Sequence, residues 1–226
     1  MLLPGTGSDE VFVRSVFEQP LRAVGISLHT PAPSPGTGLA DEYLRSLDRH
    51  AAHQPVLAGG ISLGAHLAVE WALRNPAHCA GLLLALPAWN GRPDGAPAAL
   101  AARLSAGRVA DDGLDAALRA STEGLPGWLA DELNRAWRRY GAGLADSLRT
   151  AAARPVPRLA ELRRIHVPVG VAGFVDDPVH PVAVASSWAG ELPRGRLCTT
   201  SLAAMRHDPR TLGRAAILAW LRALAG

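Results

Sequence analysis

The chain has 226 residues, of which 48% are hydrophobic and 19% are charged. That is enough apolar material for one sizeable core and too little charge for a disordered chain, so we expect a single globular domain with an insertion. All 23 basic residues are Arg and the formal net charge is only +3. No basic run is interleaved with aromatic residues, which argues against a nucleic-acid-binding protein.

Cysteine and histidine give no sign of a disulfide framework or a metal site. Cys79 and Cys198 fall in apolar, strand-like segments and are expected to be buried structural thiols. The helically spaced pair His50 and His53 has no further ligand beside it. The first residues lack a basic n-region, and no stretch is long enough to span a membrane. We therefore expect a cytoplasmic protein without a metal, and the sequence does not indicate its oligomeric state.

Short apolar runs alternate with helical patterns along the chain, which is typical of a parallel sheet covered by helices on both faces. The strand-like runs are residues 24–28, 55–58, 79–86, 167–175 and 196–200. Apolar residues at helical spacing occupy residues 39–53, 65–74 and 209–225. The pattern predicts a doubly wound, mainly parallel α/β sheet of about six strands.

One long segment, residues 89–157, interrupts this alternation between the third and fourth strand-like runs. It contains no strand-like run and shows several short helical stretches separated by glycines. A structureless loop of that length is uncommon in a compact domain, so the segment is predicted to be a helical cap. The remaining residues, 1–88 and 158–226, then form the core.

The sharpest motif is Gly60-Ile61-Ser62-Leu63-Gly64, which follows a predicted strand and precedes a predicted helix. In such a strand-turn-helix the serine takes a strained backbone conformation, and small neighbours let other chain segments approach it. A serine hydroxyl needs a base to remove its proton and an acid to orient that base. The motif therefore predicts a nucleophilic Ser62 and calls for a histidine and an acid elsewhere.

Candidates for both partners follow in the order serine, acid, histidine, each after a predicted strand. His207 precedes Asp208 and Pro209 in the loop before the last helix, and it is the predicted base. For the acid, counting from Gly173 favours Asp176. The prolines that follow favour Asp177 instead, because Pro178 directs the residue before it into extended geometry, and Asp177 is the preferred choice.

These three features together resemble the α/β-hydrolase superfamily over nearly the whole chain. The resemblance implies a Ser62-His207-Asp177 triad that acts through an acyl-enzyme, with no metal or organic cofactor. It also implies an oxyanion hole made by the backbone amides of Leu63 and of Thr6, which lies in the first loop. A serine as the central residue of this strand-turn-helix motif argues against the dehalogenase and epoxide hydrolase branches of the superfamily, which have aspartate at that position.

Other histidines and tryptophans near these motifs have simpler interpretations. His66 lies one turn beyond Ser62 and is expected to pack or to hydrogen-bond. His180 is too close in sequence to the acid to occupy a separate loop, and His29 is expected in a turn or in solvent. Three tryptophans of the cap segment could face the site but are more often core residues, namely Trp89, Trp128 and Trp137.

A cap rich in Ala, Leu and Trp favours a small or medium apolar acyl ester as the substrate, and thus a carboxylic ester hydrolase of class EC 3.1. Thioesters, lactones and carbon-carbon bonds are cleaved by the same machinery, and the sequence does not separate them. A non-catalytic protein that binds a small ligand on the same fold is the alternative from another class. The expected partner is in either case a small molecule.

Overall fold

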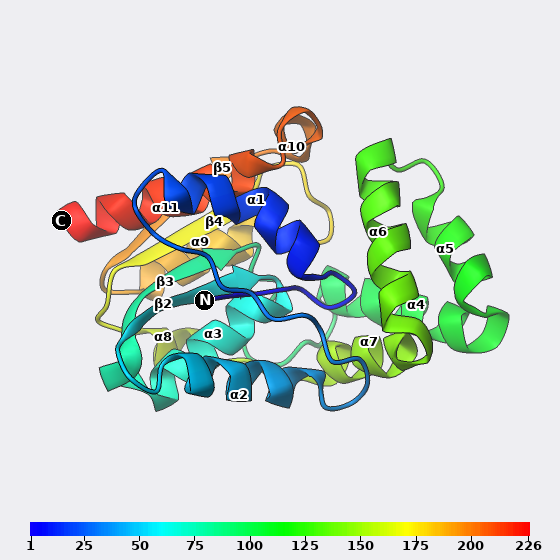
Figure 1. Ribbon diagram of the computed structural model, residues 1–226, viewed down its shortest axis with the longest axis horizontal. Helices are drawn as coiled ribbons and strands as arrows, with labels where there is room; N and C mark the ends of the chain where they lie inside the picture. The colour runs from blue at the N-terminus through cyan, green and yellow to red at the C-terminus, as the bar shows by residue number, and fades with distance from the viewer.

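The computed structural model describes all residues, 1–226, and is built on a five-stranded sheet with the order β1-β2-β3-β4-β5 (Figure 1). All neighbouring strands are parallel. The strands are β1 (Leu2–Leu3), β2 (Val56–Ile61), β3 (Cys79–Ala85), β4 (Val169–Phe174) and β5 (Gly195–Thr200). This confirms the predicted doubly wound, parallel α/β class, with a strand number close to that expected.

Helices connect every pair of strands. They are α1 (Glu10–Arg22), α2 (Leu39–His50), α3 (Leu63–Arg74), α4 (Pro97–Asp112), α5 (Leu114–Thr122), α6 (Gly127–Tyr140), α7 (Leu144–Ala153), α8 (Leu159–Leu162), α9 (Val182–Glu191), α10 (Leu202–His207) and α11 (Arg210–Ala225), with short 3₁₀ turns η1 (Pro76–His78) and η2 (Gly141–Gly143). The three helices predicted around 39–53, 65–74 and 209–225 are confirmed as α2, α3 and α11. No helix combines the length and the apolar character needed to cross a bilayer.

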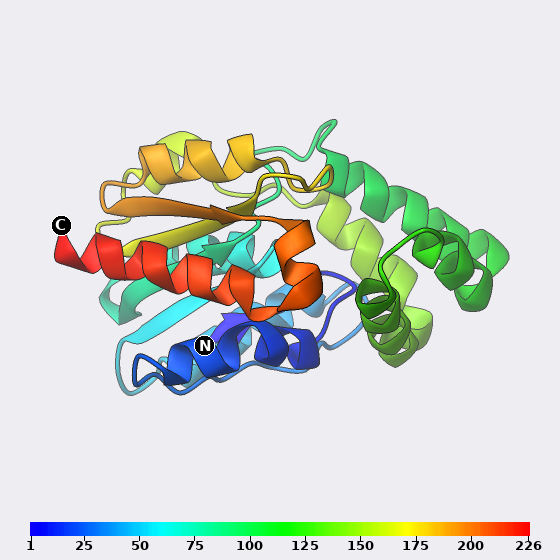
Figure 2. The ribbon, with the colours of Figure 1, turned by 90° about the horizontal axis from the view of Figure 1, so that it is seen from above.

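Helices cover both faces of the sheet, because strand side chains alternate between the two faces. Leu2, Leu83 and Phe174 belong to the core under α1 and α11. Leu3 and Leu84 belong to the core under α2, α3 and α9. Figures 1 and 2 show these two layers, with α1 and α11 together on one side and α2 and α3 on the other.

The prediction of a strand at residues 24–28 is wrong. The chain turns there at the end of α1, where the Ile26 N–H donates to the Leu21 carbonyl and Gly25 has φ 75°. Just after this stretch, the His29 carbonyl accepts the Leu2 N–H at 2.9 Å. The edge strand is instead the very short β1, which pairs with Gly59 and Gly60 of β2. A two-residue strand carries too little pattern to be seen in the sequence.

Between β3 and β4 the chain forms helices and no strand, in agreement with the pattern read from the sequence. Helices α4 to α7 lie beyond the end of the sheet to which the strands point (Figures 1 and 2). An ion pair ties the end of this segment to α3, because Arg154 contacts both carboxylate oxygens of Glu70 at 2.9 and 3.0 Å. The segment therefore stands on the side of the sheet where α/β proteins bind their ligands.

The two cysteines are free thiols. Cys79 is buried at the start of β3, as expected, and burial raises its pKa to about 11, with smaller opposing contributions from the Gly81 backbone and the chain terminus. Cys198 in β5 is only half-buried, so the prediction of two buried thiols holds for Cys79 alone. The difference arises because β5 is the last strand of the sheet and is less completely covered.

The crossing of α1 and α11 depends on Gly213, because a Cβ there would overlap the Val16 carbonyl oxygen. We predict that Gly213→Ala lowers the free energy of unfolding by about 1–3 kcal/mol, through overpacking of this crossing. Gly107→Ala in α4 is the matched control, since nothing lies within 4 Å of its Cβ position and alanine is the better helix former. Urea unfolding of both variants checks this, and an equal effect of the two changes would contradict it.

Candidate active site

Ser62 occupies a sharp turn between β2 and α3. Its backbone has φ 53° and ψ −113°, and it is one of only two non-glycine residues with positive φ in the chain. The turn is tight because a Cβ on either Gly60 or Gly64 would overlap the carbonyl oxygen of Leu3. A non-glycine residue held in such a conformation is strained, and strain of this kind is concentrated at functional sites. The predicted strand-turn-helix around Ser62 is therefore present.

Backbone hydrogen bonds hold this turn and leave the serine side chain free. The Ser62 N–H donates to the Ala85 carbonyl of β3 at 2.9 Å, and the Ser62 carbonyl accepts from the His66 N–H at 3.1 Å. Ser62 precedes the first residue of α3, but its hydroxyl makes no capping bond. The hydroxyl is instead within 3.0 Å of a ring nitrogen of His180.

His180 lies in the loop between β4 and α9 and connects Ser62 to a carboxylate. Its Nε2 is 3.0 Å from Ser62 Oγ, and its Nδ1 is 2.9 Å from Asp177 Oδ2. The other carboxylate oxygen of Asp177 accepts the Val179 N–H at 2.7 Å, which fixes the orientation of the carboxylate. The side chains of His180 and Asp177 are only 17% and 8% exposed. Serine, imidazole and carboxylate thus form one continuous hydrogen-bonded series.

The surroundings of Asp177 favour its ionised form. Burial of the carboxyl acts to raise its pKa, but the hydrogen bond and charge of His180 and the Val179 and His180 N–H groups outweigh this. The net result is a pKa below the usual value for aspartate. An ionised Asp177 accepts a hydrogen bond from the Nδ1–H of His180 and leaves Nε2 as the acceptor for the serine hydroxyl.

The structure does not bring His207, the predicted base, to Ser62. His207 is the last residue of the short helix α10, is exposed, and has no hydrogen bond to Ser62 or Asp177. The loop that was expected to carry it is instead wound into α10, whose first amides are held by Asp176. The imidazole that contacts Ser62 is that of His180.

His180 was not expected beside Ser62, because it shares a loop with the acid. In the structure, one loop brings both side chains together. His180 is three positions after Asp177, and this spacing lets one turn of chain place both side chains together. Pro178 and Pro181 restrict the backbone of the run Asp-Pro-Val-His-Pro. This short run, with an Asp and a His beside prolines, is the feature of the sequence from which His180 could have been identified.

The two adjacent aspartates have different partners. Asp177 contacts His180, whereas the carboxylate of Asp176 accepts the Leu202 and Ala203 N–H groups at 2.7 and 3.3 Å. Asp176 therefore caps the start of α10 instead of facing Ser62. The geometry accordingly brings together Ser62 and Asp177 among the predicted triad residues.

Of the two residues predicted for an oxyanion hole, Leu63 directly follows Ser62, and Thr6 belongs to the first loop. Leu63 is the first residue of α3, where a backbone N–H has no partner within the helix. Thr6 follows Gly5, and a Cβ on Gly5 would lie 3.5 Å from the Ser62 Cβ. The first loop therefore passes directly beside Ser62.

His66 is a buried packing residue, as predicted. Its Nε2 accepts the Ala88 N–H at 2.9 Å, and its ring lies 4.7 Å from that of Trp89 and 5.4 Å from that of Trp188. Burial lowers the pKa of His66 to about 3, and the charge of His180 contributes to the same shift. His66 is thus a neutral imidazole that supports the chain after β3.

The other residues singled out in the sequence lie as follows. Trp89 and Trp137 are buried, as expected of core residues, and Trp128 is half-buried. His29 is exposed, and its ring lies 4.5 Å from that of His50 in a tilted arrangement. These two histidines help to line a cavity of about 400 Å³, whose lining includes none of Ser62, Asp177 and His180. The candidate active site therefore stays at Ser62.

The neutral state of His66 predicts an acid-dependent loss of stability. Because its folded pKa of about 3 lies below its ordinary value of 6.5, protonation favours the unfolded chain. Its contribution to stability is complete above about pH 6.5 and is lost as the pH falls towards 3. Between pH 7 and pH 4.5 the urea midpoint of the wild type should fall more than that of His66→Gln, whose amide oxygen can still accept the Ala88 N–H. Parallel falls in both proteins would contradict this assignment.

No protein-family model and no curated protein matches the sequence, but many solved structures match the fold. MenH from S. aureus superposes with a TM-score of 0.70 at 16% identity, covering 100% of this chain and 93% of that one. A thermophilic esterase from Thermogutta terrifontis gives 0.63 at 18% identity, covering 98% and 88%. An enol-lactonase from Burkholderia xenovorans gives 0.60 at 15% identity, covering 85% and 78%. The chain has the α/β-hydrolase fold, as the sequence resemblance implied.

Proposed function

We propose that this protein is a serine hydrolase in which Ser62 is the nucleophile, His180 the general base and Asp177 the acid that orients the imidazole. The proposal is carried by one observation, the series of hydrogen bonds from Ser62 Oγ to His180 and from His180 to Asp177, at 3.0 and 2.9 Å. These distances lie within the range required for proton transfer between a nucleophile and its base. The strained turn at Ser62 supports the same role.

In the first half of the reaction, Ser62 Oγ attacks the carbonyl carbon of an acyl substrate as its proton passes to His180 Nε2. The electron pair of the carbonyl moves to its oxygen, where the N–H groups of Leu63 and Thr6 stabilise the negative charge. Collapse of this intermediate expels the alcohol, which takes the proton from His180. Asp177 remains ionised throughout and stabilises the imidazolium.

Water completes the cycle in the second half. His180 removes a proton from the water, whose oxygen attacks the acyl-enzyme through a second oxyanion. The carboxylic acid leaves, and Ser62 recovers its proton from His180. The reaction uses only groups of this chain and water.

We further propose that residues 89–157 form a cap over this site and that the substrate is a small or medium apolar acyl ester. Buried Trp89 and Trp137, which this segment contributes near His66 and the first loop, support an apolar environment for the acyl group. Thioesters and lactones fit the same chemistry, and a ligand-binding protein without turnover is the alternative of another class.

A fluorophosphonate probe followed by an ester screen tests the proposed function. Covalent labelling of the folded wild-type protein at Ser62, and none in Ser62→Ala, supports a serine hydrolase. A panel of acyl esters, thioesters and lactones of increasing chain length then identifies the substrate class. Folded protein that neither reacts with the probe nor cleaves any member of the panel would favour the binding alternative.

The choice between two histidines gives the most direct prediction. His180→Ala should lower kcat on an accepted ester by about 10⁴-fold, as should Ser62→Ala, and the double variant should lose little more because the residues act as a unit. His207→Ala is the matched control and should stay within about threefold of the wild type, since His207 is exposed and contacts neither Ser62 nor Asp177. Steady-state kinetics decides, and the reverse pattern would restore His207 as the base.

The two neighbouring aspartates give a second prediction. Asp177→Asn should lower kcat by several orders of magnitude, because an amide favours the wrong tautomer of His180 and cannot stabilise its positive charge. Asp176→Asn should leave kcat nearly unchanged and cost at most about 1 kcal/mol of stability, because asparagine still caps a helix. Kinetics and thermal unfolding of both variants test this. Severe loss in Asp176→Asn with normal turnover in Asp177→Asn would overturn the assignment.

A further inference from the structure

Asp9, at the end of the loop that carries Thr6, is a fully buried carboxylate. Its side chain is 0% exposed, and Oδ1 accepts the Val11 and Phe12 N–H groups at 3.0 and 3.1 Å, which caps the start of α1. A buried ionised carboxylate is costly unless charged partners and hydrogen bonds compensate for the lost water. The partners of Asp9 are therefore expected to be essential to the conformation of this loop.

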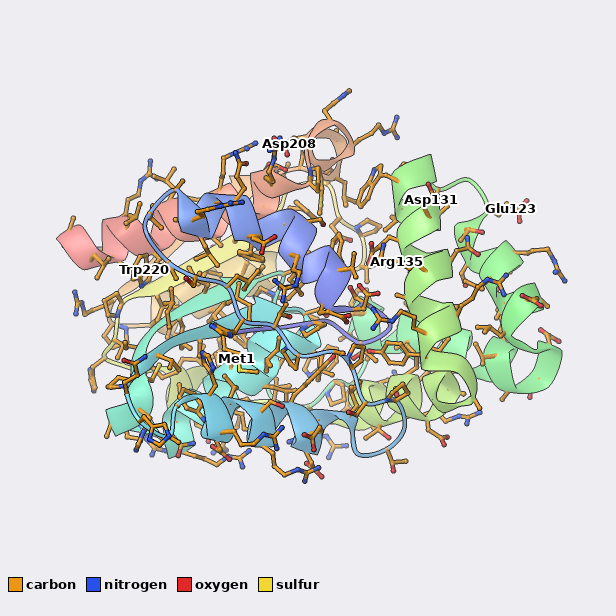
Figure 3. All side chains as sticks on the ribbon, in the orientation of Figure 1. Met1, Glu123, Asp131, Arg135, Asp208 and Trp220 are labelled. Carbon is orange, nitrogen blue, oxygen red and sulfur yellow. The ribbon has the colours of Figure 1, made fainter.

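Those partners come from α6, more than a hundred residues further along the chain. Arg135 makes a bidentate contact with the Asp9 carboxylate, at 2.8 and 3.1 Å, and Arg139 adds a longer contact at 3.4 Å. Arg135 also pairs with Glu132, and Arg139 with Glu10. Figure 3 shows Arg135 where α6 faces the beginning of α1. Burial would raise the pKa of Asp9, but its hydrogen bonds and the two arginines lower it instead, so the carboxylate stays charged.

The same helix also holds the two residues that precede Asp9. The Tyr140 hydroxyl donates to the Ser8 carbonyl at 3.1 Å. The indole nitrogen of Trp137 lies 3.0 Å from the position that a Cβ on Gly7 would occupy, and Gly7 has φ 73°. Three consecutive loop residues, immediately after Thr6, are thus each held by side chains of α6.

We infer that Asp9, Arg135 and Arg139 are positioning residues, which fix the Thr6 N–H beside Ser62 by tying the first loop to α6. This inference rests on the proposed function, because the position of the Thr6 N–H affects turnover only if an oxyanion forms beside it. None of the three side chains touches the reacting atoms. Helix α6 therefore supports turnover through the loop without supplying a catalytic residue.

The expected consequence is a loss in kcat with little change in KM. An oxyanion donor acts on charge that develops in the transition state, so a misplaced N–H weakens the transition state more than the bound substrate. Removing one such donor lowers kcat by about 10²–10³-fold, and displacing it by a fraction of an ångström should cost about 10–100-fold.

The test uses the full-length protein with three variants. Asp9→Asn keeps a side chain that caps α1 but removes the charge that pairs with α6. Arg135→Gln removes the bidentate contact by changing the partner of Asp9 on α6. Arg138→Gln is the matched control, since Arg138 lies on the same helix but pairs with the exposed Asp115. Circular dichroism and thermal unfolding establish that all of them are folded.

Two measurements are made on each protein, namely kcat and KM on an ester that the wild type accepts, and hydrogen exchange of peptides that cover residues 4–12. We expect faster exchange of that segment and a 10–100-fold lower kcat, with KM within about threefold, in Asp9→Asn and Arg135→Gln but not in Arg138→Gln. The double variant Asp9→Asn/Arg135→Gln should lose little more than the worse single variant, because both break one contact. Arg135→Lys should have a higher kcat than Arg135→Gln, since it keeps the positive charge but cannot make the bidentate contact.

Several outcomes would overturn the inference. Unchanged exchange in residues 4–12 would show that α6 does not order the loop. Faster exchange with an unchanged kcat would show that the ordering has no bearing on turnover, and faster exchange spread over the whole sheet would indicate a general structural role. A wild-type protein that no fluorophosphonate labels would count against the proposed function instead, and the exchange measurement would still decide whether α6 orders the loop.

Discussion

The close approach of β1 to the turn around Ser62 is the constraint on which the rest of the site depends. The Leu3 carbonyl oxygen occupies the space that a side chain on Gly60 or Gly64 would need. This contact lets β1 pair with β2 although it is only two residues long, and it brings the loop after β1 beside Ser62. It also confines the turn, so that Ser62 has φ 53° and its hydroxyl stands clear of the α3 backbone. A β-carbon at either glycine would separate β1 from β2 and remove the loop from the site.

The acid and the base of the proposed triad come from a single loop, which changes how the rest of the fold serves the site. Because Asp177 and His180 are three residues apart, their relative geometry is a local property of the proline-bounded turn and does not depend on β5. The last loop of the sheet is thereby free to form α10, capped by Asp176. The contact between Ser62 and His180 then depends on one tertiary relation, the distance between the end of β2 and the loop after β4.

Charged residues are few in this protein, and several of its ion pairs join distant parts of the chain. All basic residues are arginine, whose planar group can bind both oxygens of a carboxylate. Arg135 binds Asp9 across 126 positions in this way, and Arg154 binds Glu70 across 84. Both contacts connect the helical segment between β3 and β4 to the chain around Ser62. They give that segment a defined position on an otherwise apolar protein.

Local sequence patterns were sufficient to predict the class of fold, the sharp turn at Ser62 and the preference for Asp177 over Asp176 as the proposed acid. Alternating apolar runs, glycines around a serine and a proline after an aspartate each act on the residues next to them. Three further features became visible in the folded protein alone: β1 forms the sheet edge, His180 instead of His207 contacts Ser62, and Arg135 reaches Asp9. Each of these is a contact between residues that are distant in sequence. Such a contact is determined by how the helices and strands pack, and not by the local conformational preferences of the residues.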